Sequence, residues 1–107
     1  MITVSLCMIV KNEEDVLSRC LSSVQGLVEE MVVVDTGSTD STKEVARKFT
    51  DRVFDFPWAE DFSQARNFSF SQATQQFCLW MDADDVIDPE YRQGFLELKQ
   101  ALPPQTD

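Results

Sequence analysis

Carboxylates gather in one short stretch of the sequence, where Asp82, Asp84 and Asp85 follow directly on the apolar run 77–81. Two carboxylates about 4 Å apart repel each other by roughly 4 kcal/mol at an effective dielectric near 20, so such a cluster favours a bound cation. These oxygens fill only part of a coordination shell, which suits Mg²⁺ or Mn²⁺ with water and phosphate as the other ligands. We therefore interpret the stretch as a metal-carrying loop.

Acidic loops of this kind also occur without a bound ion. Aspartates are common in solvated turns that bind nothing, and this alternative stays open. An EF-hand is excluded, because the sixth position from Asp82 is Ile87 instead of glycine and the twelfth is Gln93 instead of glutamate. Asp88 precedes Pro89 and is predicted to cap a helix, so it is not counted as a ligand.

Composition limits the class of protein and of partner. Nine basic and 19 acidic residues give a net charge of −10, which argues against a nucleic acid or an anionic membrane as partner. A phosphorylated ligand would need a divalent cation to mediate its binding. Histidine is absent, so no imidazole base or ligand exists in the sequence. With 107 residues, a single domain is expected.

The cysteines and the N-terminal run bear on location. Cys7, Cys20 and Cys78 are odd in number and lack C-x-x-C spacing, which predicts buried free thiols in a reducing compartment. The apolar run 1–10 has neither a basic leader nor a cleavage site, and it is too short to span a membrane. We expect a cytoplasmic protein without a transmembrane segment.

Apolar runs alternate with helical patterns along the chain. Strands are predicted over residues 2–10, 31–34, 51–56 and 77–81, the last one buried on both faces. Helices are predicted between Asn12 and Gly26, after Ser41, over 62–75 and over 89–102. Asn12 is expected to cap the first helix. For the second helix, Ser41 with Glu44 fits a capping box, and Asp40 is also expected to act as a cap. This order predicts an α/β fold, a Rossmann-like three-layer sandwich with a mainly parallel four-stranded sheet.

Chemistry-bearing residues follow several of these strands. Lys11, Asp35 and Asp82 fall at the carboxyl ends of predicted strands, which is where open α/β sheets bind their ligands. Asp35 could accept hydrogen bonds from a nucleoside, or could serve only to form the turn that begins at Thr36. Neither G-x-G-x-x-G nor G-x-x-x-x-G-K is present, which argues against a dinucleotide fingerprint and a P-loop.

Four segments together resemble the N-terminal half of family two glycosyltransferases, namely residues 4–14, 32–40, 65–67 and 79–85. The order and spacing of these four segments make the resemblance specific, and the resemblance covers nearly the whole chain. Members of this family are inverting nucleotide-sugar enzymes with the A-type fold. The resemblance therefore implies a donor-binding site at the carboxyl ends of the strands.

The resemblance also implies roles for individual residues. The nucleotide site would consist of Lys11, Glu13, Asp35, Arg66 and Asp82. The first three would hold the nucleobase and ribose, usually of a UDP-sugar, while Arg66 would face the nucleotide and Asp82 the ribose or sugar. Asp84 would bind the Mg²⁺ or Mn²⁺ ion that bridges the diphosphate. Arg66 could instead form a surface pair with Asp61 or Glu60.

The chain also departs from the family. Such enzymes continue for roughly half a domain beyond the D-x-D strand, and that part supplies the acceptor site and the carboxylate base. No base can be nominated here, so residues 1–107 are expected to form the nucleotide-sugar-binding half without the acceptor half. A non-catalytic nucleotide-binding module or a truncated piece is the alternative. The uncovered edge of strand 77–81 predicts self-association as a homodimer.

A remote alternative comes from residues 33–38, which look like the active-site run of retroviral-type aspartic proteases. Those proteases are all-β and rich in glycine. This chain has three glycines and helical periodicity on both sides of the run, which argues against the alternative.

Overall fold

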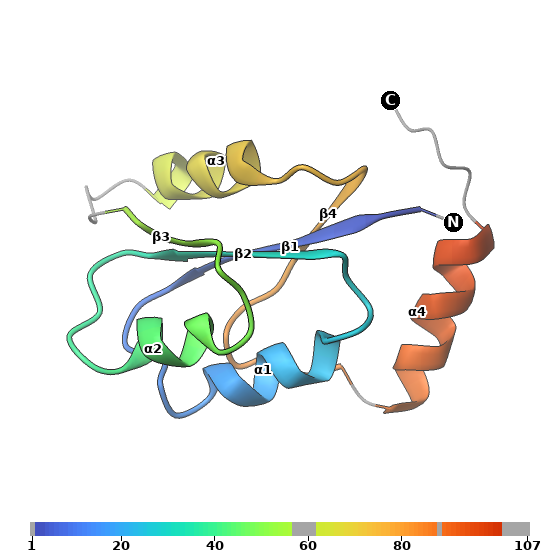
Figure 1. Ribbon diagram of the computed structural model, residues 1–107, viewed down its shortest axis with the longest axis horizontal. Coiled ribbons are helices and arrows are strands. Elements are labelled where there is room, and N and C mark those ends of the chain that lie inside the picture. Colours follow the sequence, from blue (N-terminus) through green and yellow to red (C-terminus); the bar gives the residue numbers. More distant parts are fainter. Residues whose placement is uncertain (1, 57–61, 88, 102–107) are drawn as a thin grey trace.

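The structure is a computed structural model, and it describes residues 2–56, 62–87 and 89–101. Its elements in chain order are β1 (Val4–Val10), α1 (Leu17–Val24), β2 (Glu30–Asp35), α2 (Thr42–Arg47), β3 (Val53–Asp55), α3 (Phe62–Gln72), β4 (Phe77–Trp80) and α4 (Pro89–Ala101). The predicted alternation of strands and helices is confirmed (Figure 1). Asp88, the predicted cap, lies outside the described residues, as do Glu60 and Asp61. None of the described helices is long and apolar enough to cross a membrane.

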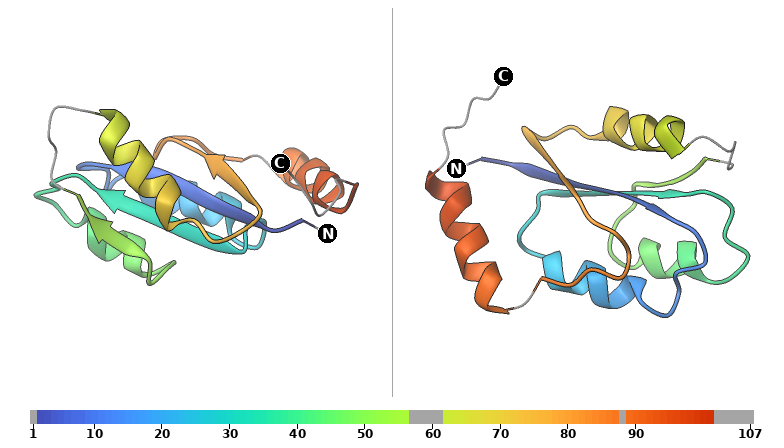
Figure 2. Two further views of the ribbon diagram at one scale, coloured as in Figure 1. Left: turned by 90° about the horizontal axis from the view of Figure 1, so that it is seen from above. Right: turned by 180° about the vertical axis from the view of Figure 1, so that it is seen from behind.

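The four strands form one parallel sheet with the order β3-β2-β1-β4. Helices α1 and α2 cover one face and α3 covers the other, while α4 lies near the chain's N-terminus (Figures 1 and 2). Each connection crosses over through a helix, as parallel neighbours require. The predicted three-layer α/β sandwich is confirmed, and this architecture is incompatible with an all-β aspartic protease.

The core forms on both faces of β1, because its successive side chains point to opposite sides of the sheet. Leu6, Met8 and Val10 join the cluster with α1 and α2, while Cys7 joins the cluster that faces α3. All four are at most 2% exposed. A strand buried on both faces requires helices above and below it, which explains the three layers.

Two predictions about strand β4 are wrong, because the strand lies at the edge of the sheet. Phe77, Leu79 and Trp80 are half-buried and Cys78 is exposed, so the prediction that the strand is buried on both faces is wrong. Cys7 and Cys20 are buried free thiols as predicted, whereas Cys78 is an exposed one. Among the described strands, β4 pairs with β1 alone, so one of its edges has no strand partner in that part of the chain, and the homodimer stays a prediction.

The helix starts also differ from the predictions. Helix α1 begins at Leu17, and Asn12 does not cap it; Asn12 has a φ of 54° and lies in a loop. The side chain of Ser41 makes no capping hydrogen bond, so the predicted capping box is wrong. The capping role expected of Asp40 is confirmed, because its carboxylate accepts the N–H of Thr42 at 2.9 Å, at the start of α2. The hydrogen bond that this carboxylate accepts from the Thr42 hydroxyl holds the pKa of Asp40 below its ordinary value.

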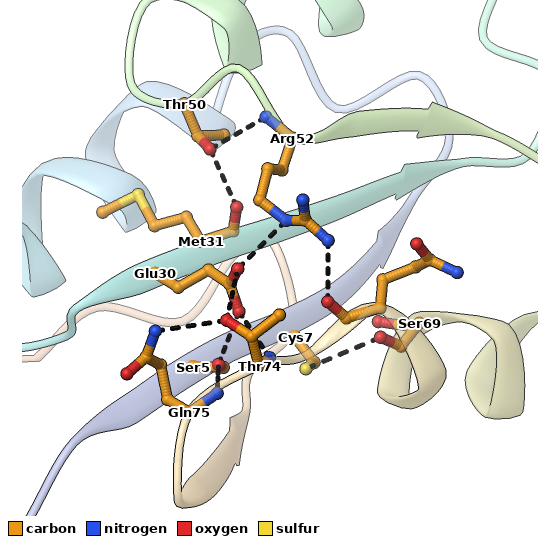
Figure 3. Close-up of polar contacts among 10 residues, drawn as sticks. Ser5, Cys7, Glu30, Met31, Thr50, Arg52, Ser69, Thr74 and Gln75 are labelled. Atoms are coloured by element: carbon orange, nitrogen blue, oxygen red, sulfur yellow. Dashed lines mark hydrogen bonds and ion pairs between the residues drawn. The ribbon is translucent and has the colours of Figure 1, made fainter.

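A polar network closes the amino end of the sheet around Glu30 (Figure 3). The Glu30 carboxylate accepts hydrogen bonds from the Ser5 hydroxyl at 2.7 Å and from the Thr74 N–H at 2.9 Å. The Arg52 Nε lies 3.0 Å from its other oxygen. Burial alone would raise the pKa of Glu30, but the hydrogen bonds and the Arg52 charge outweigh it and lower that pKa. The network therefore joins β1, β2, the start of β3 and the end of α3.

Replacing Glu30 with Gln should lower the free energy of unfolding at neutral pH by about 1–3 kcal/mol, since bonds to a charged partner are lost. A carboxylate with a lowered pKa contributes stability above its ordinary pKa of 4.5 and loses it as pH falls through the folded value. The wild type should thus lose more stability on acidification than Glu30→Gln. Urea unfolding at neutral and acidic pH measures both, with exposed Glu97→Gln as the control. Equal pH dependence of wild type and Glu30→Gln would contradict the assignment.

Candidate functional site

The carboxyl ends of the parallel strands β1, β2 and β4 meet at one edge of the sheet. Val10 pairs with Asp35, so β1 and β2 end at the same level. Trp80 pairs with Cys7, three residues before the end of β1, so β4 ends roughly 10 Å short of it. The loops that carry Lys11, Asp35 and Asp82 therefore all leave from this edge, as the sequence predicts.

Asp35 is 2% exposed and uses its two carboxylate oxygens differently. Oδ1 accepts the N–H groups of Gly37 at 2.9 Å and of Ser38 at 2.8 Å, which forms the predicted turn. Gly37 has a φ of 116°, a conformation that favours glycine. Oδ2 is buried and has no hydrogen-bond partner among the described residues. A buried acceptor without a partner costs free energy. The turn accounts for Oδ1, and a hydrogen-bond donor from a ligand would satisfy Oδ2.

The loops after β1 and β2 are bonded to each other. Asn12 donates its N–H to the Ser38 hydroxyl and accepts the Thr39 N–H on Oδ1, both at 2.8 Å. The Glu13 N–H donates to the Thr42 hydroxyl, also at 2.8 Å. These contacts hold the backbone of residues 11–13 beside the Asp35 turn. This role of Asn12 is not predicted from the sequence, although asparagine is one of the residues that tolerates a positive φ.

Lys11 and Glu13 are thus brought to the same place as Asp35, by different means. Lys11 follows β1 directly and is exposed, and it forms no ion pair within the described part of the chain. Glu13 is half-buried, and its carbonyl accepts the N–H groups of Val16 and Leu17, which leads the chain into α1.

The aspartate loop after β4 alternates between the core and solvent. Met81 and Ala83 are 7% and 5% exposed, while Asp82 and Asp84 on either side of Ala83 are exposed. Asp85 has a structural role, because its carboxylate accepts the Asp82 N–H at 3.0 Å while its own N–H donates to the Asp82 carbonyl at 3.0 Å. Buried Ala83 therefore anchors a tight turn that presents two carboxylates outward.

The carboxylates of Asp82 and Asp84 could supply only part of the ligand set of a divalent ion. No hydrogen bond or ion pair from another described residue engages the side chains of Asp82 and Asp84, and their oxygens are the hard donors that Mg²⁺ and Mn²⁺ prefer. Within the described ranges, no group of three or more Asp, Glu, Cys or His side chains could hold a metal ion. Burial, followed by the charges of Asp85, Asp84 and Asp82, raises the pKa of Cys20 to about 11, so this neighbour stays a thiol. A metal at Asp84 would need further ligands from a bound molecule.

Arg66 lies on α3, close to the end of β4. Its guanidinium is 5.4 Å from the ring centroids of both Phe70 and Trp80, and the residue is exposed. Trp80 is the last residue of β4, so these cation–π contacts hold Arg66 near the start of the aspartate loop. The sequence pattern does not predict the platform formed by Phe70 and Trp80. The alternative partners of Arg66, Asp61 and Glu60, lie outside the described residues.

A cavity of about 390 Å³ lies at the opposite end of the strands, lined among others by Glu30, Thr50 and Arg52. We place the functional site at the carboxyl edge instead, because open parallel sheets bind ligands there. Three of the charged residues that line the cavity are already paired, because Glu30 forms an ion pair with Arg52 (Figure 3) and Glu29 forms one with Lys99.

Comparison with known sequences gives matches that include nearly the whole chain. The sequence matches the model for glycosyl transferase family 2 over residues 5–105. A TPR repeat-containing protein of Synechococcus elongatus is 46% identical over 102 residues, which cover 95% of this chain and 25% of that protein. The SPbeta prophage-derived glycosyltransferase SunS of Bacillus subtilis is 31% identical over 102 residues, covering 94% of this chain and 24% of SunS. The chain thus spans about a quarter of the length of these relatives.

Comparison with solved structures agrees with the match to this family. The crystal structure of glucosyl-3-phosphoglycerate synthase from Mycobacterium tuberculosis in complex with Mn²⁺ and UDP-glucose is similar with a TM-score of 0.68 and 25% sequence identity. The similarity covers 79% of this chain and 34% of that one. The predicted A-type glycosyltransferase fold is therefore confirmed, and the chain belongs to glycosyl transferase family 2.

Proposed function

We propose that this chain binds a nucleotide-sugar, a UDP-sugar, through a divalent ion and forms the donor-binding part of an inverting glycosyltransferase. The observation that carries the proposal is the arrangement at the carboxyl edge. The buried Asp35 Oδ2 and the exposed carboxylates of Asp82 and Asp84, none of which has a partner from another described residue, lie at the same edge of the sheet. The buried Asp35 oxygen suits a neutral hydrogen-bond donor. The carboxylates of Asp82 and Asp84 suit a cation that also binds an anionic ligand. A nucleoside diphosphate sugar supplies both kinds of group in one molecule.

The nucleoside half of the proposed site consists of the two bonded loops. Asp35 Oδ2 would accept a hydrogen bond from a ring N–H or a ribose hydroxyl, which satisfies an acceptor that has no partner in the described ranges. Lys11 and Glu13 would flank the base and ribose, because the bonds of Asn12 to Ser38 and Thr39 hold their backbone there. The turn that fixes Asp35 is complete before any ligand binds, so little reorganisation is needed.

The diphosphate half consists of the aspartate loop and Arg66. Asp84 would hold Mg²⁺ or Mn²⁺, and Asp82 would contact the ribose or sugar. The ion, when bound, would neutralise the diphosphate and act as a Lewis acid for the leaving nucleotide. Arg66, fixed over Phe70 and Trp80, would add a positive charge. Such charges are needed because the chain itself carries a net charge of −10.

Inverting transfer also needs a base that deprotonates the attacking hydroxyl. We assign residues 1–107 to donor binding and place the acceptor site and the base outside them, in keeping with the greater length of the relatives. A non-catalytic nucleotide-binding module is the second candidate, and it is distinguished by UDP binding without sugar transfer or donor hydrolysis. The free thiols Cys7 and Cys20 lead us to propose a reducing, cytoplasmic location.

Replacing Asp35 with Asn should test the nucleoside half. The amide oxygen can still accept the N–H groups of Gly37 and Ser38, so the free energy of unfolding should change by less than about 1 kcal/mol. The amide nitrogen then replaces Oδ2, so a hydrogen-bond donor faces the donor group of the ligand. UDP affinity should therefore fall about 10- to 100-fold. Calorimetric titration with UDP and Mn²⁺ measures this, with exposed Asp51→Asn at the opposite edge as the control. Unchanged affinity in Asp35→Asn would refute the assignment.

Two matched variants of the aspartate loop should test the metal half. Asp84→Asn removes the charge from the proposed ligand and should lower Mn²⁺-dependent UDP affinity at least about tenfold. Asp85→Asn removes the same charge but keeps an acceptor for the Asp82 N–H, so its effect should be small. The measurement is the UDP affinity with and without Mn²⁺. Equal losses in the two variants would show that the loop acts through its total charge alone.

A further inference from the structure

Both ends of the aspartate loop are hydrogen-bonded to one helix, α1. At the start of the loop, the Cys20 thiol lies 3.6 Å from the Asp82 carbonyl oxygen and can donate to it. At the end, the Ile87 N–H donates to the Ser23 hydroxyl at 3.0 Å. Cys20 and Ser23 are three residues apart and therefore neighbours on the helix surface. The helix thus fixes the backbone on both sides of Asp84.

Apolar packing supports the same contact. The loop side chains in the cluster with α1 are Met81, Ala83 and Ile87. The helix side chains in this cluster are Leu17, Cys20, Leu21 and Val24, all 0% exposed. Ala83 separates the two exposed aspartates, so its packing determines how far their carboxylates stand from the helix. A fixed backbone beneath exposed side chains limits the positions that their oxygens can take.

Ser23 is itself held in place from two directions. Its hydroxyl donates to the Cys20 carbonyl at 2.7 Å, which leaves the oxygen lone pairs for the Ile87 N–H. Its carbonyl accepts a hydrogen bond from Arg92 of α4 at 2.7 Å, and Arg92 also donates to the Gln25 carbonyl at 3.1 Å. A guanidinium at the carboxyl end of a helix satisfies its last carbonyls and suits its dipole. Helix α4 therefore fixes the end of α1 that carries Ser23.

We propose that Cys20 and Ser23 are positioning residues that hold the aspartate loop, and with it Asp82 and Asp84, in the geometry that binds the divalent ion. The inference rests on the proposed function of the loop. It goes beyond that function because it assigns the positioning of the metal-binding carboxylates to α1, a helix that itself supplies no metal ligand. Metal affinity depends on how well the groups behind the ligands orient them, and their loss costs about 10- to 100-fold.

Adjacent serines of α1 provide a matched test. Ser23→Ala removes the acceptor for the Ile87 N–H, whereas Ser22→Ala removes an exposed hydroxyl of the same helix. We expect Ser23→Ala to weaken Mn²⁺ binding in the presence of UDP about tenfold, as measured by the electron paramagnetic resonance signal of free Mn²⁺. Binding of uridine without metal should stay within about twofold, because it uses the loops after β1 and β2. Ser22→Ala should change neither, and Ser23→Thr, which keeps the hydroxyl, should restore Mn²⁺ binding.

Cys20→Ala provides a second variant, with Cys7→Ala as its control. Both remove a buried thiol, but Cys7 faces α3 on the other side of the sheet and donates to the Ser69 carbonyl at 3.9 Å. Cys20→Ala should weaken Mn²⁺ binding and leave uridine binding unchanged, whereas Cys7→Ala should change neither. Because both variants lose a buried sulfur, a general loss of stability does not produce the expected difference between them.

Amide hydrogen exchange separates failure of this inference from failure of the proposed function. Exchange at Ile87 should be faster in Ser23→Ala than in Ser22→Ala, whether or not a metal binds. Faster exchange together with weaker Mn²⁺ binding and intact uridine binding supports the inference. Unchanged Mn²⁺ binding in Ser23→Ala, or an equal loss of uridine binding, overturns it. A wild type that binds neither Mn²⁺ with UDP nor uridine overturns the proposed function, and the metal role of Cys20 and Ser23 with it.

Discussion

The register of β1 between β2 and β4 is the constraint on which the rest of the structure depends. Leu6, Met8 and Val10 on one face and Cys7 on the other are at most 2% exposed, and fully burying a large apolar side chain contributes about 1.5–3 kcal/mol. A slip of one residue would exchange the two faces, and Leu6 and Met8 would then meet α3. It would also move Val10 away from Asp35. The same apolar alternation that stabilises the core therefore sets the level at which the site residues leave the sheet.

Within the site, carboxylates are placed in two different environments. Asp35 is buried, and its desolvation is offset by two backbone N–H groups on one oxygen, which leaves the other in need of a donor. Asp82 and Asp84 stay hydrated, so they incur little desolvation but repel each other and any phosphate. A hydrogen-bond donor satisfies the first environment and a cation the second. This difference explains how a chain with a net charge of −10 could hold an anionic ligand at its acidic edge.

The sequence predicts the strands well and the loops poorly, for a physical reason. Apolar runs indicate burial directly, so β1 and β2 lie where expected, with Lys11 directly after β1 and Asp35 at the end of β2. An apolar run does not report whether a strand has one neighbour or two, so the predicted burial of β4 on both faces and of Cys78 is wrong. Asn12 fits the pattern of a helix cap, but its hydrogen-bond partners Ser38 and Thr39 lie in a different loop. Contacts between distant loops have no local signature, and the docking of the aspartate loop on Cys20 is not predicted for the same reason.

The geometry of α1 explains why one short helix reaches both halves of the proposed site. The chain leaves β1 at the carboxyl edge, bonds to the loop after β2 through residues 12–14, and only then enters α1 at Leu17. The helix runs back along the sheet with a rise of about 1.5 Å per residue, so Cys20 and Ser23 lie roughly 5–9 Å beyond Leu17. Strand β4 ends roughly 10 Å short of β1, a comparable distance back from the edge. The early end of β4 and the return of α1 therefore meet at the aspartate loop. A longer β4 would carry Asp82 and Asp84 past the residues that support them.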